Sequence, residues 1–302
     1  MLGAILYGEP APGLIEVPAG AAQVSPLIPG SADLIEIAEG SVAAAFVLAP
    51  AGTLERDDTL ALTLRALRPG GTLTAFAPKD KGGARLRKAL ERFGCEVVED
   101  ARKHHRFCRT TRPTKPSGLE AAIAAGAPQF LPALGLWSQP GVFSWDRIDP
   151  GSAALSSAMP RLAGRGADLG CGVGVLAAHV LASPAVEALA CIDIDRRAIA
   201  CAQRNVDDPR VTLSWADARG PADDPRGLDF VVMNAPFHAA GNEDRDLGVA
   251  FIRAAGARLR KGGVCWLVAN RHLPYEAPLS SIFASFAVRA DTGGYKVIEA
   301  RR

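Results

Sequence analysis

Hydrophobic and polar positions follow two different patterns in the last two thirds of this chain of 302 residues. Short apolar runs alternate with stretches in which apolar residues recur every three or four positions. The runs predict buried strands, and the recurring pattern predicts helices that pack on them. The predicted strands are GADLG, ALACIDI, VTLSW, DFVVMNA and VCWLVAN, and helices are expected from about Val173, from about Arg196 and over Leu247 to Leu259.

Strands and helices that alternate in this way specify parallel strands joined by crossover helices. The chain then reads FAVRA, DTGG and YKVIEA, which predicts two antiparallel strands around a tight turn. We therefore expect an α/β fold whose Rossmann-like sheet is doubly wound and mostly parallel, with a C-terminal antiparallel hairpin.

A segment rich in Pro and Gly runs from Pro113 to Gly141 and is typical of a connector between domains. We place the boundary near residue 115, which gives domains 1–115 and 116–302. Within the connector, Gly118 to Ala127 predicts a short Ala-rich helix.

A weak internal repeat relates the two halves. LRPGGTL at 67–73 matches LRKGGVC at 259–265, and AFVLAP at 45–50 resembles DFVVMN at 229–234. Duplication of an α/β unit produces such a pattern. The N-terminal copy has no glycine-rich turn where the C-terminal copy has one, so we expect two tandem Rossmann-like domains of which the first is degenerate and binds no cofactor.

Composition and charge exclude several classes of protein. Six cysteines show neither a CxxC pair nor a cluster with His at metal-ligand spacing, so we expect no metal site and a reducing compartment. With neither a signal-peptide pattern nor a membrane-spanning apolar run, the sequence predicts a cytoplasmic protein that does not bind membranes. We further expect a monomer.

The net charge of +2 is too small to indicate nucleic-acid binding by itself. Between residues 79 and 115, however, twelve Lys or Arg stand against five acidic residues. Such an excess is as typical of a solvated helix face as of an RNA-contacting surface. Candidate RNA contacts in this segment are Arg85, Arg87 and Lys88.

A glycine-rich turn, ADLGCGVGVL at 167–176, follows the first predicted strand of the second half. Glycine permits the tight turn and the close approach of a ligand. Asp193 ends the next strand, where a carboxylate can accept hydrogen bonds from two ribose hydroxyls. Asp217 ends the strand after that, where it can accept the adenine amino group, and Asp195 is expected to be a helix N-cap.

The glycine spacing distinguishes two cofactors. Dinucleotide sites carry GxGxxG, whereas this turn is GxGxG with an acid, Asp168, two residues before it. An acid repels a pyrophosphate but attracts the ammonium and sulfonium groups of S-adenosylmethionine. The sequence therefore predicts S-adenosylmethionine, with contacts from Asp168, Gly170, Cys171, Gly172, Gly174, Asp193, Ile194, Asp217, Ala218 and Asn234.

The fourth predicted strand ends in Asn234-Ala235-Pro236-Phe237, followed by His238. Ligands lie beyond the carboxyl ends of the strands in such a sheet, so Asn234 is expected beside the methyl donor. An exocyclic base amine is a poor nucleophile, and the Asn234 side-chain oxygen and the Ala235 carbonyl can each accept one of its N–H groups and orient its lone pair. Phe237 would stack on the base. We expect residues 234–237 to be catalytic, while His238 is either a substrate contact or structural.

These motifs resemble those of the bacterial 16S rRNA guanine-N2 methyltransferases of the RsmC type. The resemblance rests on PGVFS at 140–144, IDPGS at 148–152, the DLGCGVG turn, NAPFH and GYKV at 294–297. It implies two methyltransferase-like domains, guanine N2 as the target and ribosomal RNA or the small ribosomal subunit as the partner. It also implies that Phe143, Ser144 and Asp149 fold over the cofactor. Ala235 replaces the first proline of the family's Asn-Pro-Pro-Phe, which keeps the acceptor carbonyl and removes rigidity.

Two other interpretations stay open. The same acceptor geometry serves a guanine of large-subunit rRNA, an adenine of DNA or a protein glutamine. A non-catalytic RNA-binding assembly protein is the second, although such a protein has no need of Asp193, Asp217 and Asn234 together. A 5-methylcytosine enzyme is disfavoured because neither the fourth nor the fifth strand offers a Pro-Cys nucleophile.

Overall fold

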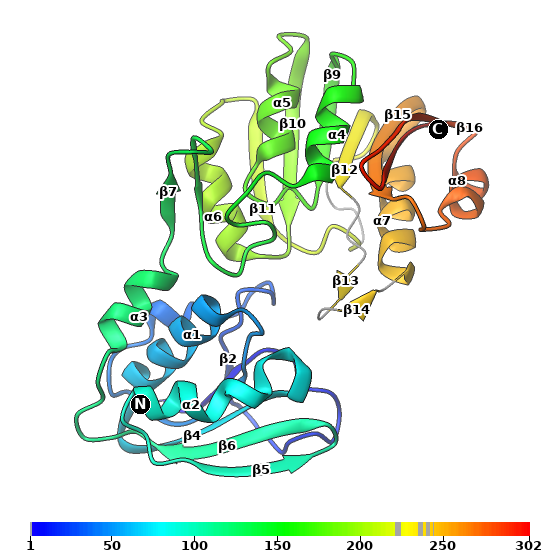
Figure 1. Ribbon diagram of the computed structural model, residues 1–302. Helices are drawn as coiled ribbons and strands as arrows, with labels where there is room; N and C mark the ends of the chain where they lie inside the picture. Colours follow the sequence, from blue (N-terminus) through cyan, green and yellow to red (C-terminus); the bar gives the residue numbers. More distant parts are fainter. Residues whose placement is uncertain (1, 221–224, 235–237, 240–241, 244) are drawn as a thin grey trace. The chain divides into compact units, whose positions relative to one another are not determined.

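The computed structural model describes residues 2–220, 225–234, 238–239, 242–243 and 245–302 (Figure 1). The chain forms two compact units. The first contains Met1–Pro128 and Gln139–Gly141, and the second contains Gln129–Ser138 and Val142–Arg302. Among the described residues, no helix is long and apolar enough to cross a membrane.

A seven-stranded sheet in the order β11-β10-β9-β12-β15-β17-β16 forms the centre of the second unit. Neighbouring strands from β11 to β15 are parallel, whereas β17 is antiparallel to both β15 and β16. The predicted mostly parallel sheet with a terminal hairpin is therefore confirmed for this unit. The strands are β9 (Gly164–Leu169), β10 (Val186–Asp193), β11 (Val211–Trp215), β12 (Leu228–Asn234), β15 (Leu259–Asn270), β16 (Ser285–Thr292) and β17 (Tyr295–Arg301).

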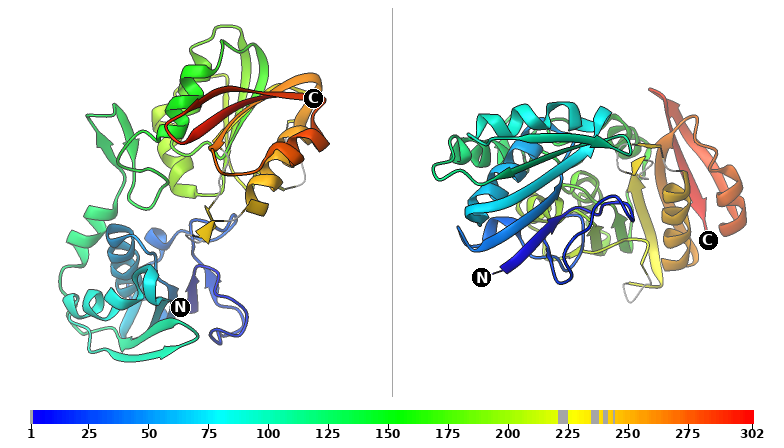
Figure 2. Two further views of the ribbon diagram at one scale, coloured as in Figure 1. Left: turned by 45° about the vertical axis from the view of Figure 1, so that its right-hand side comes forward. Right: turned by 90° about the horizontal axis from the view of Figure 1, so that it is seen from below.

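Helices cover both faces of this sheet (Figure 1, Figure 2). Residues of α7 and α8 pack with Leu169 and Met233 on one face, and residues of α4, α5 and α6 pack with Cys191 and Val232 on the other. The sequence pattern missed α4 and α8, which are short and lack a clear apolar period. The helices are α4 (Pro150–Ala158), α5 (Val175–Leu181), α6 (Arg196–Asn205), α7 (Arg245–Arg258) and α8 (Glu276–Ile282). Two small hairpins pair β7 (Gln129–Leu131) with β8 (Leu136–Ser138) and β13 (His238–Ala239) with β14 (Asn242–Glu243).

The first unit contains a six-stranded sheet in the order β2-β1-β3-β4-β6-β5. Its strands are β1 (Leu2–Tyr7), β2 (Ala22–Gln23), β3 (Val42–Leu48), β4 (Leu67–Pro78), β5 (Val98–Arg102) and β6 (His105–Thr111). Its helices are α1 (Thr53–Ala66), α2 (Ala84–Arg92) and α3 (Leu119–Gly126), with short helical turns η1 (Leu34–Glu36) and η2 (Lys79–Gly83).

The helices of the first unit pack on a single face of its sheet. The main core contains side chains of α1, α2 and α3, whereas Leu14 and Ile15 cover Phe76 and Phe107 on the other face. The prediction of a doubly wound sheet is therefore wrong for this unit. The reason lies in residues 8–41, which are all described and which form β2 and η1 but no α-helix between β1 and β3.

The units divide after Pro128, later than the boundary predicted near residue 115. The predicted Ala-rich helix is present as α3, and it packs on α1 so closely that a Cβ atom at Gly126 would lie 2.3 Å from Cβ of Asp58. Gln139 then donates a hydrogen bond from Nε2 to the Gly126 carbonyl at 2.9 Å. These contacts keep α3 in the first unit.

The two units share a pattern of strand pairing. Five strands follow the order β1-β3-β4-β6-β5 in the first unit and β9-β12-β15-β17-β16 in the second. The pairs β3–β4 and β12–β15 change register at the same point, as shown by Val42↔Leu67 then Ala44↔Thr72, and by Leu228↔Leu259 then Phe230↔Val264. In this register Leu48 is equivalent to Asn234, so the sequence alignment of residues 45–50 with 229–234 is two residues out of step.

Candidate active site

The strand register brings the predicted site residues to one edge of the second sheet. Asp168 pairs with Cys191 on one side and Val232 on the other. Asn234, two residues beyond Val232, is therefore level with Gly170, and adjacent strands in a sheet are about 4.8 Å apart. Asp193 ends the strand on the other side of the glycine turn.

The glycine turn needs glycine because Gly170, Gly172 and Gly174 have φ values of +75°, +54° and +91°. Its carboxyl end is fixed by Asn205 of α6, which the sequence analysis did not identify. The Asn205 side chain donates hydrogen bonds from Nδ2 to the carbonyls of Val173 and Trp137, each at 2.8 Å. The turn is thereby tied to α6 and β8.

The Asp193 carboxylate stabilises the glycine turn through hydrogen bonds from the backbone. Its Oδ2 accepts a hydrogen bond from Gly172 N at 2.7 Å, and its Oδ1 accepts one from Asp195 N at 2.8 Å. Burial raises its pKa to about 6. A carboxylate has about four acceptor positions, so each oxygen can still accept a hydrogen bond from a ribose hydroxyl group.

Asp168 is fully buried, and neither carboxylate oxygen forms a hydrogen bond of normal geometry with the described residues, although the Ala177 backbone N–H is near enough to lower its pKa slightly. Burial and then the neighbouring Asp193 carboxylate raise its pKa to about 8. A buried acid without a partner is costly unless a cation or donor meets it. The chemistry of this position therefore fits a positively charged ligand group such as the ammonium of S-adenosylmethionine.

Ile194 leaves its hydrophobic side chain 38% exposed just after Asp193. Its carbonyl accepts a hydrogen bond from Trp215 Nε1 at 2.9 Å, which fixes this residue. An exposed aliphatic surface next to a ribose-binding acid suits the face of an adenine ring. The side chains of Cys171 and Ala218 are buried in the core, so these two predicted contact residues can offer only backbone groups.

Asp217 follows β11 at the same edge, but its carboxylate is engaged by Arg219. Arg219 donates from its backbone N to Oδ1 at 2.8 Å and from Nη2 to Oδ2 at 2.6 Å. The Arg219 hydrogen bonds lower the pKa of Asp217. The contact of Asp217 with adenine stays a prediction. In such a contact the adenine amino group would share the Asp217 carboxylate with Arg219. Asp195 caps α6 as predicted, accepting a hydrogen bond from Arg197 N at 2.9 Å.

Asn234 is held in one orientation by α4. Its Nδ2 donates to Asp149 Oδ2 at 2.7 Å and to Ser152 Oγ at 3.0 Å. An ionised carboxylate only accepts hydrogen bonds, so the amide nitrogen, rather than the oxygen, must face Asp149. The Asn234 Oδ1 faces away from this pair and accepts no hydrogen bond from the residues that the structure describes.

Asp149 is itself fixed by the first turn of α4. It is the N-cap of this helix, and its Oδ2 accepts a hydrogen bond from Ser152 N at 2.9 Å. A Cβ atom at Gly151 would lie 2.9 Å from Oδ2 of Asp149 and 3.0 Å from the Tyr295 ring, so this turn requires glycine. The sequence analysis assigned a role to Asp149, whereas it named Gly151 and Ser152 only as part of the IDPGS motif.

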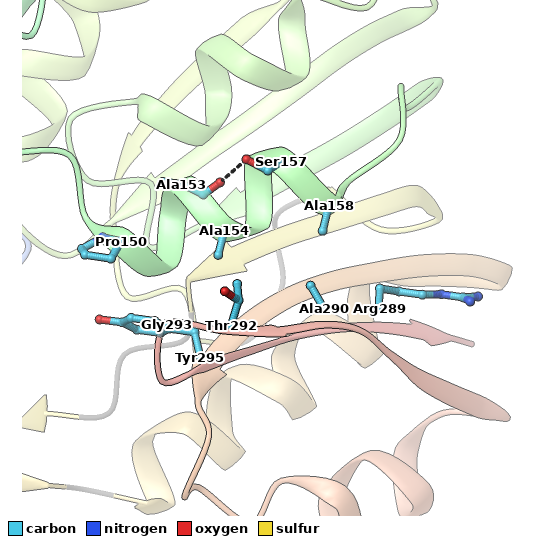
Figure 3. Close-up of a pocket in the computed structure, with 10 residues that line it drawn as sticks. All are labelled: Pro150, Ala153, Ala154, Ser157, Ala158, Arg289, Ala290, Thr292, Gly293 and Tyr295. Atoms are coloured by element: carbon cyan, nitrogen blue, oxygen red, sulfur yellow. Dashed lines mark hydrogen bonds between the residues drawn. The ribbon is translucent and has the colours of Figure 1, made fainter.

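The segment before α4 carries the other two residues predicted near the cofactor. Phe143 is 64% exposed, and Ser144 has a φ of +52°, which is unusual for a residue other than glycine. Their contact with the cofactor stays a prediction. The helix α4 and the β16–β17 hairpin border an open groove of about 590 Å³, which is lined by residues that include Ala154, Arg289 and Tyr295 (Figure 3).

Three of the predicted catalytic residues, Ala235, Pro236 and Phe237, lie outside the described residues, as does the side chain of His238. In the first unit, Arg85, Arg87 and Lys88 are exposed on α2, and Arg87 forms an ion pair with Glu91 at 2.8 Å. Within the described part of the chain, no three His, Cys, Asp or Glu side chains gather as a metal site.

Comparison with known proteins identifies the family to which the chain belongs. The family model described as "Methyltransferase small domain" matches residues 133–299. Ribosomal RNA small subunit methyltransferase C of Pseudomonas paraeruginosa is 32% identical over 87% of this chain and 80% of its own length. The protein of that name from Shewanella sediminis is 34% identical over 76% of this chain and 68% of its own length. The match to the Idiomarina loihiensis protein is 40% identical and spans 48% of that protein.

A solved structure is similar over both units. It is the T. thermophilus 16S rRNA N2 G1207 methyltransferase in complex with AdoMet and guanosine, with a TM-score of 0.74 and 27% identity over 89% of this chain and 75% of that chain. The chain belongs to the ribosomal RNA small subunit methyltransferase C family.

Proposed function

We propose that the chain uses S-adenosylmethionine to methylate guanine N2 in 16S rRNA. The orientation of the Asn234 amide carries this proposal, since Asp149 and Ser152 hold Nδ2 and leave Oδ1 as an acceptor at the edge of the sheet. Its relatives are named as small-subunit rRNA methyltransferases, and the similar T. thermophilus enzyme was solved with AdoMet and guanosine.

The reaction needs an acceptor at this position. Guanine N2 is a weak nucleophile because its lone pair is delocalised into the ring. When Asn234 Oδ1 accepts one N2–H group, it holds the lone pair in line with the methyl group, and the N–C bond forms as the C–S bond breaks. Bound S-adenosylmethionine supplies the methyl group on a sulfonium. The methylated N2 is acidic and loses its proton to solvent, so no strong base is required of the chain.

Transfer of label from methyl-labelled S-adenosylmethionine to 16S rRNA, followed by mass spectrometry of the digested nucleosides, tests the proposed function. We expect N2-methylguanosine as the labelled product. Labelled N6-methyladenine, or methylation of protein alone, would assign the same acceptor geometry to another planar amine. Absence of any transfer would contradict an enzymatic role.

Asp168→Asn should weaken S-adenosylmethionine binding on the order of tenfold and remove most of its pH dependence. Asp168 has a raised pKa of about 8, so its neutral form predominates at lower pH and a cationic ligand must displace the proton. The affinity of the native chain should therefore rise with pH and level off above the Asp168 pKa of about 8. Calorimetric titration at several pH values measures both effects.

Asp229→Asn is the matched control, because Asp229 lies near the amino end of β12 and pairs with Arg260 at 2.6 Å. Its pKa is lowered by hydrogen bonds from Arg165 N and Arg260. This variant should bind the cofactor with native pH dependence. An Asp168→Asn protein whose affinity still rises with pH like that of the native chain would refute the role of Asp168.

The first unit is a degenerate copy of the second in this proposal, and the shared strand register supports it. In that register Leu6, Gly8 and Leu48 occupy the positions of Asp168, Gly170 and Asn234. Apolar side chains thus replace both the cofactor acid and the base acceptor. Gly8 also lies so close to Leu48 that a Cβ atom there would be 2.9 Å from the Leu48 Cβ. The role left for this unit is RNA docking, and the chain acts on ribosomal RNA or the small subunit as a cytoplasmic monomer.

Charge reversal of Arg85, Arg87 and Lys88 to Glu should weaken RNA binding and lower its salt dependence if α2 contributes to docking. The three side chains are exposed on α2, whose other face is buried through Leu86 and Leu90. Filter binding or anisotropy over a range of salt concentrations measures the effect. Native affinity and native salt slope in this variant would assign the three side chains to ordinary solvation.

A further inference from the structure

The turn that joins β5 to β6 places basic residues in a backbone conformation that favours glycine. Residues 102–106 read Arg-Lys-His-His-Arg, and we refer to them as the basic turn. Lys103 and His104, at its centre, have φ values of +47° and +60°. Two consecutive left-handed residues form the hairpin turn that normally selects Asn-Gly or Gly-Gly, because a Cβ atom strains this conformation.

The second unit makes the same turn with glycine. Gly293 and Gly294 join β16 to β17 with φ values of +59° and +84°. The two turns occupy equivalent places, since Lys79 N donates to the His104 carbonyl at 3.0 Å and Arg271 N donates to the Gly294 carbonyl at 2.8 Å. The fold therefore does not require residues other than glycine at positions 103 and 104. Backbone strain of this kind points to a function for the Lys103 and His104 side chains.

The basic turn is exposed and rigidly held. Arg102, Lys103 and His104 are exposed, and Lys103 Nζ donates to the Gly13 carbonyl at 2.7 Å. His105 Nδ1 is hydrogen-bonded to the Lys103 carbonyl at 2.7 Å, and the Arg102 guanidinium lies 4.3 Å from the centre of the Phe107 ring. The Lys103 ammonium has three N–H groups, so two can still reach a ligand.

The charges around the basic turn are mainly positive. Lys79 is exposed in the adjacent helical turn η2, which also contains Lys81 and one acid, Asp80. Strand β5 carries two acids, the exposed Asp100 and Glu99, and Glu99 forms an ion pair with Arg106 at 3.0 Å. A fixed, exposed group of cations is complementary to an anionic chain whose charges lie at regular spacing.

We infer that the basic turn binds the phosphate backbone of RNA, as a docking contact of the first unit. The inference rests on the proposed function, which makes RNA the substrate. Ammonium, guanidinium and imidazole groups donate hydrogen bonds to phosphate oxygens without reading base edges, so the contact is independent of RNA sequence. It adds a site outside α2 and outside the methylation site.

The double variant Lys103→Gly, His104→Gly in the full chain tests the inference against 16S rRNA and an unrelated RNA stem-loop. The Kd should rise on the order of tenfold for both RNAs, with a salt slope lower by about 1. The midpoint of thermal unfolding should stay equal or rise, because glycine relieves the strain. Arg102→Gln should weaken binding in the same direction without changing the turn. The control is Arg68→Gln, which removes an exposed cation near the amino end of β4.

Native affinity and native salt slope in the double-glycine and Arg102→Gln variants would overturn the inference. Equal loss of binding in the Arg68→Gln control would also overturn it, since any cation of the unit would then serve. Methyl transfer by the native chain is measured separately. If the native chain methylates no RNA, the proposed function fails while the binding comparison still decides the role of the basic turn.

Discussion

Asn234→Ala is expected to bind S-adenosylmethionine with native affinity and to lose on the order of 10²–10³ in the rate of methyl transfer. The variant removes Oδ1, the acceptor that orients the base amine, and leaves Asp168, Asp193 and the glycine turn in place. Since the interaction is strongest as the lone pair localises on nitrogen, the loss should appear in kcat more than in KM. Single-turnover transfer to 16S rRNA and calorimetric titration of the cofactor measure the two quantities.

The control for this variant is Asn270→Ala. Asn270 ends β15, the next strand, and pairs with Tyr295 of β17. The substitution removes the same side chain from the same edge of the sheet without touching Asp149 or Ser152. A native rate in this control and a large loss in Asn234→Ala would locate the effect at one side chain. A native rate in both variants would contradict the acceptor role.

The sequence predicted the second unit well because its signals are local. Apolar runs, a glycine turn and acids at strand ends are each read within a few residues, and together they defined the sheet edge where Asp168, Asp193 and Asn234 lie. The short helix α4 lacks such periodicity. Its signals were an Asp at the N-cap and a Pro at the first helical position, which are weaker than a repeated apolar face.

Contacts between distant segments could not be read from the sequence. Asp149 and Asn234 are separated by 85 positions, and their hydrogen bond depends on how α4 packs against the sheet.

The sequence alignment of residues 45–50 with residues 229–234 failed for another reason. A slip of two residues along a strand returns every side chain to the same face, so the apolar pattern alone cannot exclude it. Only the register of β3 with β4 shows that Leu48 takes the place of Asn234.

Asp149→Asn is expected to slow methyl transfer on the order of tenfold to a hundredfold while leaving the fold and the cofactor affinity nearly unchanged. Asn is as good an N-cap as Asp, so α4 keeps its first turn. The new amide, however, can donate a hydrogen bond to Asn234 Oδ1 and turn the Asn234 amide over. The base amine then meets a donor in place of an acceptor. The rate constant of transfer and the thermal midpoint separate this effect from loss of structure.

Asp33→Asn is the control for the cap. Asp33 caps η1 in the first unit, where it accepts a hydrogen bond from Ile35 N at 3.2 Å. The same substitution there should leave methyl transfer unchanged. A similar loss of rate in this control would attribute the effect of Asp149→Asn to general destabilisation.

Exchanging the side chains of Asp149 and Asn234 between their two positions tests whether Asp149 positions the Asn234 amide. Asn234→Asp alone should be nearly inactive, because two carboxylates then face each other at the 2.7 Å hydrogen-bond distance and one must take up a proton. In the double variant Asp149→Asn, Asn234→Asp, the amide at 149 donates to the carboxylate at 234, which presents its second oxygen to the base. We expect the double variant to transfer methyl groups faster than Asn234→Asp, and the loss in the double variant to fall short of the sum of the two single losses by a coupling energy of about 0.5–3 kcal/mol. Strictly additive losses would mean that Asp149 does not set the orientation of the acceptor.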